Sequence, residues 1–440
     1  MKQDLAARVR ARLREHVPPD ARLVVGLSGG IDSVVLLHLL VRGLRLSPRR
    51  ISALHVNHQL SPRAAGWATF CRRWCRILGI RLRVVKVVVK RGNSTEAAAR
   101  SARHAAFAAS GADIVVLAHN RDDQAETVLL QLFRGAGPRG LAAMPAFRPG
   151  GPHAPAVLRP LLDMSRKAIA EYASRHGLQW VEDDSNEDRH YMRNLLRHDV
   201  LPLIEERRAG AKAVLARAAR LQAEAADLQD ALALIDLGGD LPQGQLDLLP
   251  LRVLEPYRAR NALRLFLRGN GLPMPDADRL EELLRQALTA GRDAAVCMRL
   301  DESDLRRFRD VLYIVKPVPA PDRPLELQWY GRGVLRLKPL GGSLRLVRST
   351  EGGIDGQLIR GLGFRVCSRQ GGEALRLAPG GRLRAVRKLL QEANCPPWMR
   401  ERLPFLYLDG QLAAVPGLGI DVHFRVPSGR EGYLPIWHPD

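Results

Sequence analysis

Apolar and polar positions in the first two hundred residues follow two alternating patterns. Short apolar runs rich in β-branched residues predict buried strands at Leu23–Leu27, Ile51–Asn57, Arg81–Val89 and Ile114–Ala118. Helical periodicity predicts helices at Ser33–Val41, Ala64–Leu78, Glu96–Ala109 and Asp122–Phe133. Strands that alternate with helices are typical of a parallel sheet covered on both faces. The N-terminal part is therefore predicted to be an α/β domain built on a doubly wound parallel sheet.

The pattern changes beyond residue 210. Ala211–Leu234 contains no glycine or proline and predicts one long helix, and two further helices are predicted at Tyr257–Gly269 and Asp278–Ala290. The proline-rich stretch Lys316–Pro321 is typical of a linker. The remainder has short strands separated by glycine turns, with one helix at Leu383–Ala393. We expect a catalytic α/β domain, a mainly helical domain and a small α/β C-terminal domain, at 1–208, 209–316 and 325–440.

Charge is the feature of the composition that narrows the function most. The 440 residues include 68 Lys and Arg against 46 Asp and Glu, which gives a formal net charge of +22. A globular protein this basic most often binds a polyanion, and nucleic acid is the leading candidate. Arginine dominates the basic residues, and its guanidinium group binds phosphate and stacks on bases, which favours RNA. A compositional bias toward arginine and alanine would explain part of the same excess.

The cysteines and the apolar runs indicate where the protein works. Five scattered cysteines, an odd number, fit reduced thiols better than a disulfide framework, so we expect a cytoplasmic protein. Cys71 and Cys75 lie one helical turn apart, without a second pair to complete a metal site. Met1–His16 has an amphipathic helical pattern without a signal-peptide core. No apolar run approaches the ~20 residues that span a bilayer, so no membrane partner is expected.

The turn between the first predicted strand and helix carries the most specific chemical signal. Ser28–Ser33 has the sequence Ser-Gly-Gly-Ile-Asp-Ser. Its glycines allow close backbone approach, and N–H groups, serine hydroxyls and a helix N-terminus together bind an anion such as phosphate. The Gly-Lys-Ser/Thr ending of the P-loop in kinases and GTPases is missing. Asp32 would repel phosphate unless it binds a metal ion or orients a reacting group. An ordinary glycine-rich turn is the alternative.

Polar clusters also follow two other predicted strands. His55–His58 ends the second strand, and His119–Glu126 follows the fourth. Ligands of doubly wound folds bind at the carboxyl ends of the strands, so we expect both clusters to share one site with the glycine-rich turn.

Acidic and basic side chains near these strand ends suit a charged substrate. Asp122 is a candidate N-cap, while Asp123 and Glu126, three residues apart on one helix face, could hold a metal ion or an ammonium group. Arg100 and Arg103 could bind ATP phosphates or a substrate carboxylate. Solvated acids at a capped helix start, and a surface arginine pair, are the alternatives.

The order of these motifs resembles the tRNA(Ile)-lysidine synthase family, which belongs to the PP-loop ATP pyrophosphatase superfamily. The matching segments are Ser28–Ser33, His55–Leu60, Glu96–Arg100, His119–Thr127, Phe133–Gly135, Gly140–Leu141, Arg159–Leu162, Asp184–Asn186, Arg193–Asn194, Arg387–Leu390, Pro396–Pro404 and Ala414–Gly419. The resemblance covers nearly the whole chain and is weakest between about 235 and 381. His104 stands where tyrosine is expected, and Asn120 where a second histidine is common. Neither is a residue on which the chemistry obviously depends.

The resemblance implies an ATP-dependent ligase. The family joins lysine to C2 of the wobble cytidine of tRNA(Ile) with a CAU anticodon, through an adenylated cytidine. AMP and pyrophosphate are released, and the product, lysidine, reads AUA instead of AUG. ATP would be bound by Ser28, Gly29, Gly30, Ile31, Asp32, Ser33 and His55. Asp32 would also act in catalysis by holding Mg²⁺ between the phosphates.

The resemblance also implies roles around the substrates. His119 would act as an acid or base or bind the α-phosphate, and Arg193 would stabilise the adenylated intermediate. The lysine substrate would be bound by Asp123, Glu126, Arg100 and Arg103. The two acids would take its α-ammonium group, and one of the two arginines its carboxylate. The partners are tRNA(Ile), lysine and ATP, and a homodimer stays open.

Three other functions fit parts of the sequence. A tRNA thiolase of the same superfamily would need cysteines for sulfur transfer or an iron–sulfur cluster, usually as Cys-x-x-Cys, and the sequence has no such pair. A glutamine-dependent amidotransferase would need an amidase part, and Lys2 stands where one such type has its nucleophilic cysteine. A basic RNA-binding protein with a degenerate nucleotide site is the third alternative, and the intact Asp32, His119 and Asp123 argue against it.

Overall fold

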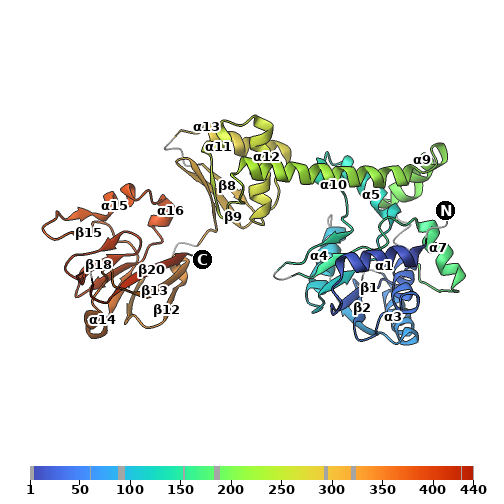
Figure 1. Ribbon diagram of the computed structural model, residues 1–440, viewed down its shortest axis with the longest axis horizontal. Helices are drawn as coiled ribbons and strands as arrows, with labels where there is room; N and C mark the ends of the chain where they lie inside the picture. The colour runs from blue at the N-terminus through green and yellow to red at the C-terminus, as the bar shows by residue number, and fades with distance from the viewer. Residues whose placement is uncertain are drawn as a thin grey trace. The chain divides into compact units, whose positions relative to one another are not determined.

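The structure is a computed structural model that describes residues 4–59, 61–87, 95–151, 154–182, 189–291, 296–318, 324–427 and 429–439. The chain forms two compact units, Met1–Ala231 and Leu232–Asp440. Figure 1 colours the first unit from blue through green and the second from yellow-green to red. Our three domain boundaries are finer than this division and stay predictions.

A six-stranded sheet forms the centre of the first unit (Figure 1). Its strands lie in the order β3-β2-β1-β4-β6-β5. Their bounds are β1 Leu23–Gly26, β2 Ile51–Asn57, β3 Arg81–Lys86, β4 Ile114–Val116, β5 Phe147–Arg148 and β6 Ala156–Leu158. Five strands are parallel, and β5 is an antiparallel edge strand. The predicted doubly wound α/β fold is confirmed.

Helices cover both faces of this sheet because neighbouring residues of a strand point to opposite sides. Val25 of β1 packs in a core with α1 (Leu5–His16), α2 (Ile31–His38), α3 (Ala64–Leu78) and α7 (Arg166–Arg175). Val24 packs in a separate core with Phe107 of α4 (Thr95–Ala108). The predicted helix Ala64–Leu78 has the same bounds as α3, and α2 continues as a π-helical turn over Leu39–Gly43.

Short helices and one long helix follow the sheet. They are α5 Arg121–Leu132, α6 Pro138–Leu141, α8 Met192–Leu195, the π-helical turn Leu196–Val200, α9 Leu201–Arg207 and α10 Ala211–Asp236. The predicted long helix is therefore α10, and it runs through the boundary between the two units.

The second unit begins with three helices packed on a small sheet. The helices are α11 Leu249–Arg252, α12 Pro256–Gly269 and α13 Ala277–Thr289. The antiparallel sheet has the order β7-β10-β9-β8, with bounds Gln245–Asp247, Val311–Val315, Ser303–Phe308 and Cys297–Leu300. Phe266 of α12 and Leu305 of β9 share one core. The sequence analysis predicted the two longer helices but not this sheet.

Antiparallel sheets make up most of the C-terminal part. A five-stranded sheet has the order β11-β14-β17-β18-β19, with bounds Glu326–Trp329, Phe364–Cys367, Phe405–Leu408, Gln411–Val415 and Gly419–Ile420. A three-stranded sheet has the order β12-β13-β20, with bounds Val334–Leu337, Gly342–Ser349 and Gly432–Pro439. The helices are α14 Gly356–Leu362, α15 Val386–Glu392 and α16 Pro397–Arg400.

The predicted helix at Leu383–Ala393 is wrong at its start. Helix α15 begins only at Val386, because Arg384–Ala385 form strand β16 and pair with β15 (Ala374–Leu375). In the described part of the chain, no helix combines the length and the apolar character needed to cross a membrane.

Candidate active site

The glycine-rich turn between β1 and α2 is held by its own hydroxyl groups. Ser33 Oγ donates to the carbonyl of Gly30 (2.9 Å) and accepts from the N–H of Gly29 (3.2 Å). Ser28 Oγ lies 3.1 Å from Ser33 Oγ and accepts from the N–H of Gly30 at 3.3 Å. Gly30 is the N-cap of α2 and supplies no side-chain hydrogen bond, so this helix N-terminus is suited to an external anion.

Position 29 requires glycine for two reasons, its backbone conformation and the closeness of the Val181 side chain. Its φ of +95° favours glycine, and a Cβ atom there would lie 2.7 Å from Cγ2 of Val181. The N–H of Val181 donates to the carbonyl of Gly29 at 3.0 Å. A chain segment about 150 residues away along the sequence therefore forms one wall of the glycine-rich turn.

Asp32, in the first turn of α2, faces the beginning of α5. Its Oδ1 accepts a hydrogen bond of 3.1 Å from Nδ2 of Asn120. Burial, and to a smaller extent the charge of Asp123, raise the pKa of Asp32 to about 6, although Arg166, the Asn120 hydrogen bond and Arg197 act in the opposite direction. The structure thus brings the ends of β1 and β4 together around one carboxyl group of unusually high pKa.

Asn120 is the N-cap of α5, and the predicted N-cap at Asp122 is wrong. Asn120 Oδ1 accepts from the N–H groups of Asp122 (2.9 Å) and Asp123 (3.1 Å), and Asp123 Oδ2 accepts from the N–H of Asn120 (2.9 Å). This reciprocal pattern is a capping box. Asp122 instead accepts from Lys212 Nζ at 2.6 Å and from the N–H of Arg166 at 3.2 Å. Asn120 also donates to Asp32, a contact that the sequence did not reveal; whether the chemistry depends on Asn120 stays a prediction.

Two arginines hold the acidic pair of α5. Glu126 is only 2% exposed and accepts from Arg193 Nε (2.9 Å) and Arg197 Nε (2.6 Å). Asp123 accepts from Arg197 Nη2 at 3.1 Å. Burial opposes the charge of Arg197, but Glu126, Asp123 and Asp32 outweigh it and raise the pKa of its guanidinium group. Sequence reasoning missed Arg197; its signal was the spacing of four residues from Arg193.

His55 contacts the backbone at Leu27, directly before the glycine-rich turn. It is buried in β2, and its Nδ1 lies 2.9 Å from the carbonyl of Leu27. Because a carbonyl can only accept, Nδ1 is the protonated nitrogen and Nε2 is the acceptor of this ring. Burial lowers the pKa of His55, so the ring is neutral. Cys71 Sγ lies 3.7 Å from His55 Nδ1, and burial raises the pKa of this thiol to about 12, which makes it a packing residue.

His119 follows β4 and lies in a strongly positive environment. Burial, together with the charges of Arg159, Arg193, Arg103 and Arg100, lowers its pKa to about 3. Its buried Nδ1 has no hydrogen-bond partner among the described residues. Arg100 and Arg103 are exposed on α4, yet close enough to act on this ring. The imidazole is neutral at neutral pH and has a ring nitrogen available to a ligand.

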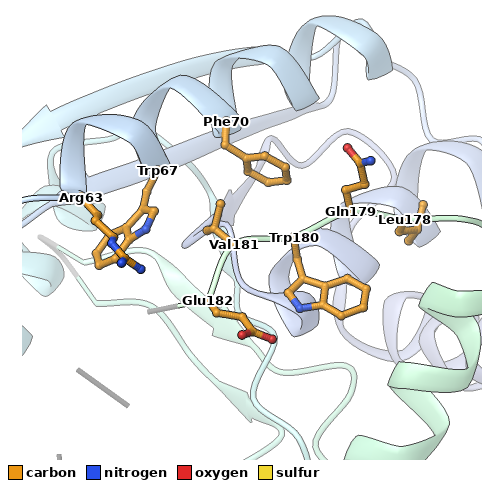
Figure 2. Close-up of a pocket in the computed structure, with 8 residues that line it drawn as sticks. All are labelled: Arg63, Trp67, Phe70, Leu178, Gln179, Trp180, Val181 and Glu182. Carbon is orange, nitrogen blue, oxygen red and sulfur yellow. The ribbon is translucent and has the colours of Figure 1, made fainter. Parts of the chain in front are cut away.

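A pocket of about 720 Å³ opens beside the glycine-rich turn. Figure 2 shows its two walls: Trp67 and Phe70 project from α3, and Leu178–Glu182 runs opposite them. In this segment Val181 points toward α3, whereas the Trp180 ring points away (Figure 2). Phe70 lies close to the position that a Cβ of Gly29 would take. Sequence reasoning did not find this pocket, because its walls are far apart along the chain.

Some of the predicted motif residues cannot be placed. Leu60 and Asp184–Asn186 lie outside the described residues, as do Val88 and Val89 of the third predicted strand and Pro319–Pro321 of the predicted linker.

Family models match most of the chain. A PP-loop domain matches residues 1–204, a TilS substrate binding domain matches 246–313, and a TilS substrate C-terminal domain matches 364–437. The first match, together with the glycine-rich turn at the end of β1, defines the class: this is an enzyme with a PP-loop domain that uses ATP.

Similar proteins narrow the class to one family. The chain is 40% identical over 432 residues to a tRNA(Ile)-lysidine synthase of Nitrosomonas europaea, covering 97% of this chain and 94% of that protein. It is 41% identical over 436 residues to one of Chromobacterium violaceum, covering 97% and 98%. A solved U34-tRNA thiolase of Methanococcus maripaludis is 20% identical with a TM-score of 0.43, covering 50% of this chain and 78% of that chain. The chain belongs to the tRNA(Ile)-lysidine synthase family, and the predicted ligase class is confirmed.

Proposed function

We propose that this enzyme ligates lysine to C2 of the wobble cytidine of tRNA(Ile) with a CAU anticodon. The cytosine O2 attacks the α-phosphate of ATP and pyrophosphate leaves; the ε-amine of lysine then attacks C2 and AMP leaves. The product, lysidine, changes decoding from AUG to AUA. One observation carries the proposal: Asp32 of the glycine-rich turn is hydrogen-bonded to Asn120, the N-cap of the helix that carries Asp123 and Glu126. The chain is also related over its full length to these synthases.

ATP phosphates suit the N-terminus of α2. The N–H groups of Gly29 and Gly30 hold the hydroxyls of Ser33 and Ser28 at the turn, and no side chain caps the helix. Mg²⁺ in such sites takes one or two carboxylates together with phosphate oxygens, so a single carboxylate beside this turn fits it. Asp32 would hold the ion, which offsets the charge of the departing pyrophosphate when bound. Among the described residues no cluster of three or more His, Cys, Asp or Glu could hold a metal without such help.

His119 is better suited to donate a neutral hydrogen bond than to act as a general base. A pKa of about 3 leaves the ring almost no affinity for a proton at pH 7. Its neutral ring can donate one hydrogen bond to an α-phosphate oxygen, and Arg193, which acts on the same ring, adds positive charge nearby. We therefore assign His119 and Arg193 to the adenylated intermediate.

Lysine would bind where Asp123 and Glu126 lie. Both carboxylates already pair with arginine, and Glu126 is almost fully buried, so the α-ammonium group would reach Asp123 first. Arg100 or Arg103 on α4 would take the carboxylate. Lysine thus competes with Arg197 for the same acidic groups.

The pocket in Figure 2 would take the adenine ring of ATP. It adjoins the glycine-rich turn through Val181, and aromatic side chains bind a flat base by stacking. We expect Trp67→Ala to raise the KM for ATP about tenfold, since loss of base stacking costs ~1–3 kcal/mol. Steady-state kinetics with varied ATP would check this. Trp74→Phe, on the same helix but outside the pocket, is the control; an unchanged KM in Trp67→Ala would contradict the assignment.

The decisive experiment is incorporation of radiolabelled lysine into tRNA(Ile) with a CAU anticodon, with and without ATP. Labelling that requires ATP and does not occur on tRNA(Met), which shares the anticodon, supports the whole proposal. Release of AMP and pyrophosphate without labelling would keep the adenylation and reject lysine as the nucleophile. A homodimer stays an untested expectation that sedimentation of the full chain would decide.

A further inference from the structure

Three arginines form a cluster beside β6, and the proposed reaction uses only Arg100, as a candidate partner of the lysine carboxylate. Arg159 directly follows β6, Arg148 ends β5, and Arg100 lies on α4. Burial, together with the charges of Arg100 and Arg148, lowers the pKa of Arg159 to about 10. The same three arginines lower the pKa of His104. These elements come from separate parts of the sequence, so only the fold brings the charges together.

Arg159 is the buried member of this arginine cluster. It is 6% exposed, its Nη1 donates to the carbonyl of Pro145 at 2.9 Å, and its buried Nε has no hydrogen-bond partner among the described residues. Arg148 donates only to the carbonyls of Pro149 (3.4 Å) and Pro155 (3.5 Å).

Arg148 and Arg159 have no acidic partner among the described residues. Within the side chains that the structure describes, no carboxylate forms an ion pair with either of them, whereas Arg193 and Arg197 are both paired. Buried charges in proteins are normally paired, because an uncompensated charge costs several kcal/mol. The repulsion among these arginines therefore destabilises the free protein, and binding of an anion removes that destabilisation.

The position of the arginine cluster indicates which anion it binds. Strand β6 pairs with β4, which pairs with β1, so the glycine-rich turn is two strand positions from Arg159, or about 10 Å. Arg148 is exposed on the edge strand β5, and His119 follows β4. Arg148 lies opposite Val157 and donates toward Pro155, so the cluster extends along β6 from the exposed edge strand to Arg159, at the same strand ends as the turn that suits the phosphates of ATP.

We propose that Arg148 and Arg159 form a phosphate-binding subsite for the tRNA backbone next to the target nucleotide. The inference rests on the proposed function for the identity of the nucleic acid. A base that enters the site must bring its flanking phosphates with it, and guanidinium groups bind phosphate oxygens in pairs. The phosphates of ATP offer the same chemistry, so the experiment must separate the two sources.

The test compares two charge reversals in the full chain. Arg148→Glu changes the exposed member of the cluster. Arg81→Glu is the control, because Arg81 is an exposed first residue of β3 and so lies at the amino ends of the strands, away from the site. Filter binding with tRNA(Ile) at several KCl concentrations gives Kd and its salt dependence, and initial rates with varied ATP give the KM.

We expect Arg148→Glu to weaken tRNA binding about tenfold and to reduce the salt slope by about one, as the loss of one phosphate contact does. The KM for ATP and the behaviour of the control should stay within twofold of the wild type. A raised KM for ATP with unchanged tRNA binding would overturn the proposal in favour of ATP phosphates. Equal effects of the two reversals on tRNA binding would overturn it outright.

A second variant tests the buried member without removing its charge. Arg159→Lys keeps the cation but loses the planar fork, and we expect about fivefold weaker tRNA binding with an unchanged far-UV spectrum. Wild-type binding in this variant would contradict a role for the guanidinium group of Arg159. If lysine is not incorporated by the wild type, the proposed reaction fails; the tRNA-binding arm still tests the subsite, because it requires no turnover.

Discussion

Asp32→Asn is expected to abolish ATP-dependent turnover and, at pH 8, to raise the melting temperature. Turnover should fall at least a hundredfold, because an amide cannot replace the carboxylate as a ligand of Mg²⁺ between phosphates. The hydrogen bond from Asn120 can persist, since the amide oxygen of the variant still accepts. The opposite signs of the two effects distinguish a functional carboxylate from a structural one.

The sign of the stability effect follows from the pKa of Asp32. Burial raises it to about 6 in the folded protein, above the ordinary value of 3.8. A raised pKa means that ionisation costs more in the folded than in the unfolded chain. This contribution to stability is full below pH 3.8 and is lost as the pH rises through about 6. Asparagine stays neutral, so it avoids the loss at pH 8.

Differential scanning fluorimetry at pH 5 and pH 8, with lysine-incorporation rates, would check both effects. The increase in melting temperature should be larger at pH 8, and wild-type activity should decrease as the pH falls through about 6. Glu171→Gln, an exposed acid on α7, is the control and should change neither quantity. A lower melting temperature for Asp32→Asn at pH 8 would contradict the conclusion that the ionised carboxylate of Asp32 destabilises the folded protein.

The sequence predicted the first unit well because its strands are continuous apolar runs. β2 and α3 have the predicted bounds, because burial on both faces of a parallel sheet gives the sequence a strong local pattern of apolar residues. The sheet of β7 to β10 was not predicted. Its strands are short and include charged residues such as Arg306 and Arg307, so antiparallel pairing rather than local pattern defines them. Because β16 occupies Arg384–Ala385, the helix expected at 383–393 begins later than predicted.

In the candidate site, too, features within one segment could be predicted from the sequence, whereas contacts between distant segments could not. The glycine-rich turn could be predicted, because its glycines, serines and Asp32 lie within six residues. The bond from Asn120 to Asp32 joins residues 88 apart along the chain, and that from Arg197 to Glu126 joins residues 71 apart. A pattern within one segment cannot reveal such pairs. The spacing of Asp123 and Glu126 predicted that they share a cation, but the structure adds that arginine already holds them.

Arg197→Met is expected to destabilise the protein by about 3 kcal/mol, because removing one partner of a buried ion pair leaves the other charge uncompensated. Arg197 donates to Glu126 at 2.6 Å and 2.9 Å and to Asp123 at 3.1 Å. Arg193 would remain as the partner of Glu126. Urea unfolding of the full chain would measure the change in the free energy of unfolding.

The control for this effect is an ion pair of similar length on the surface. Arg189 and Asp199 are 2.8 Å apart, and Arg189 is well exposed. Arg189→Met should cost less than about 1 kcal/mol, as exposed ion pairs generally do. Equal costs for the two variants would show that burial does not strengthen the Arg197 network.

A double-mutant cycle then separates the ion pair from the packing of the side chains. Glu126→Gln alone leaves both arginines without their buried carboxylate, and we expect it to cost about as much as Arg197→Met. The double variant removes charge from both sides, so its cost should be at least 1 kcal/mol below the sum of the single costs. Additive costs would mean that Arg197 stabilises the site through its contacts alone. A large coupling would mean that the ion pair itself stabilises the fold, so that lysine bound at these carboxylates, as we propose, would have to compete with it.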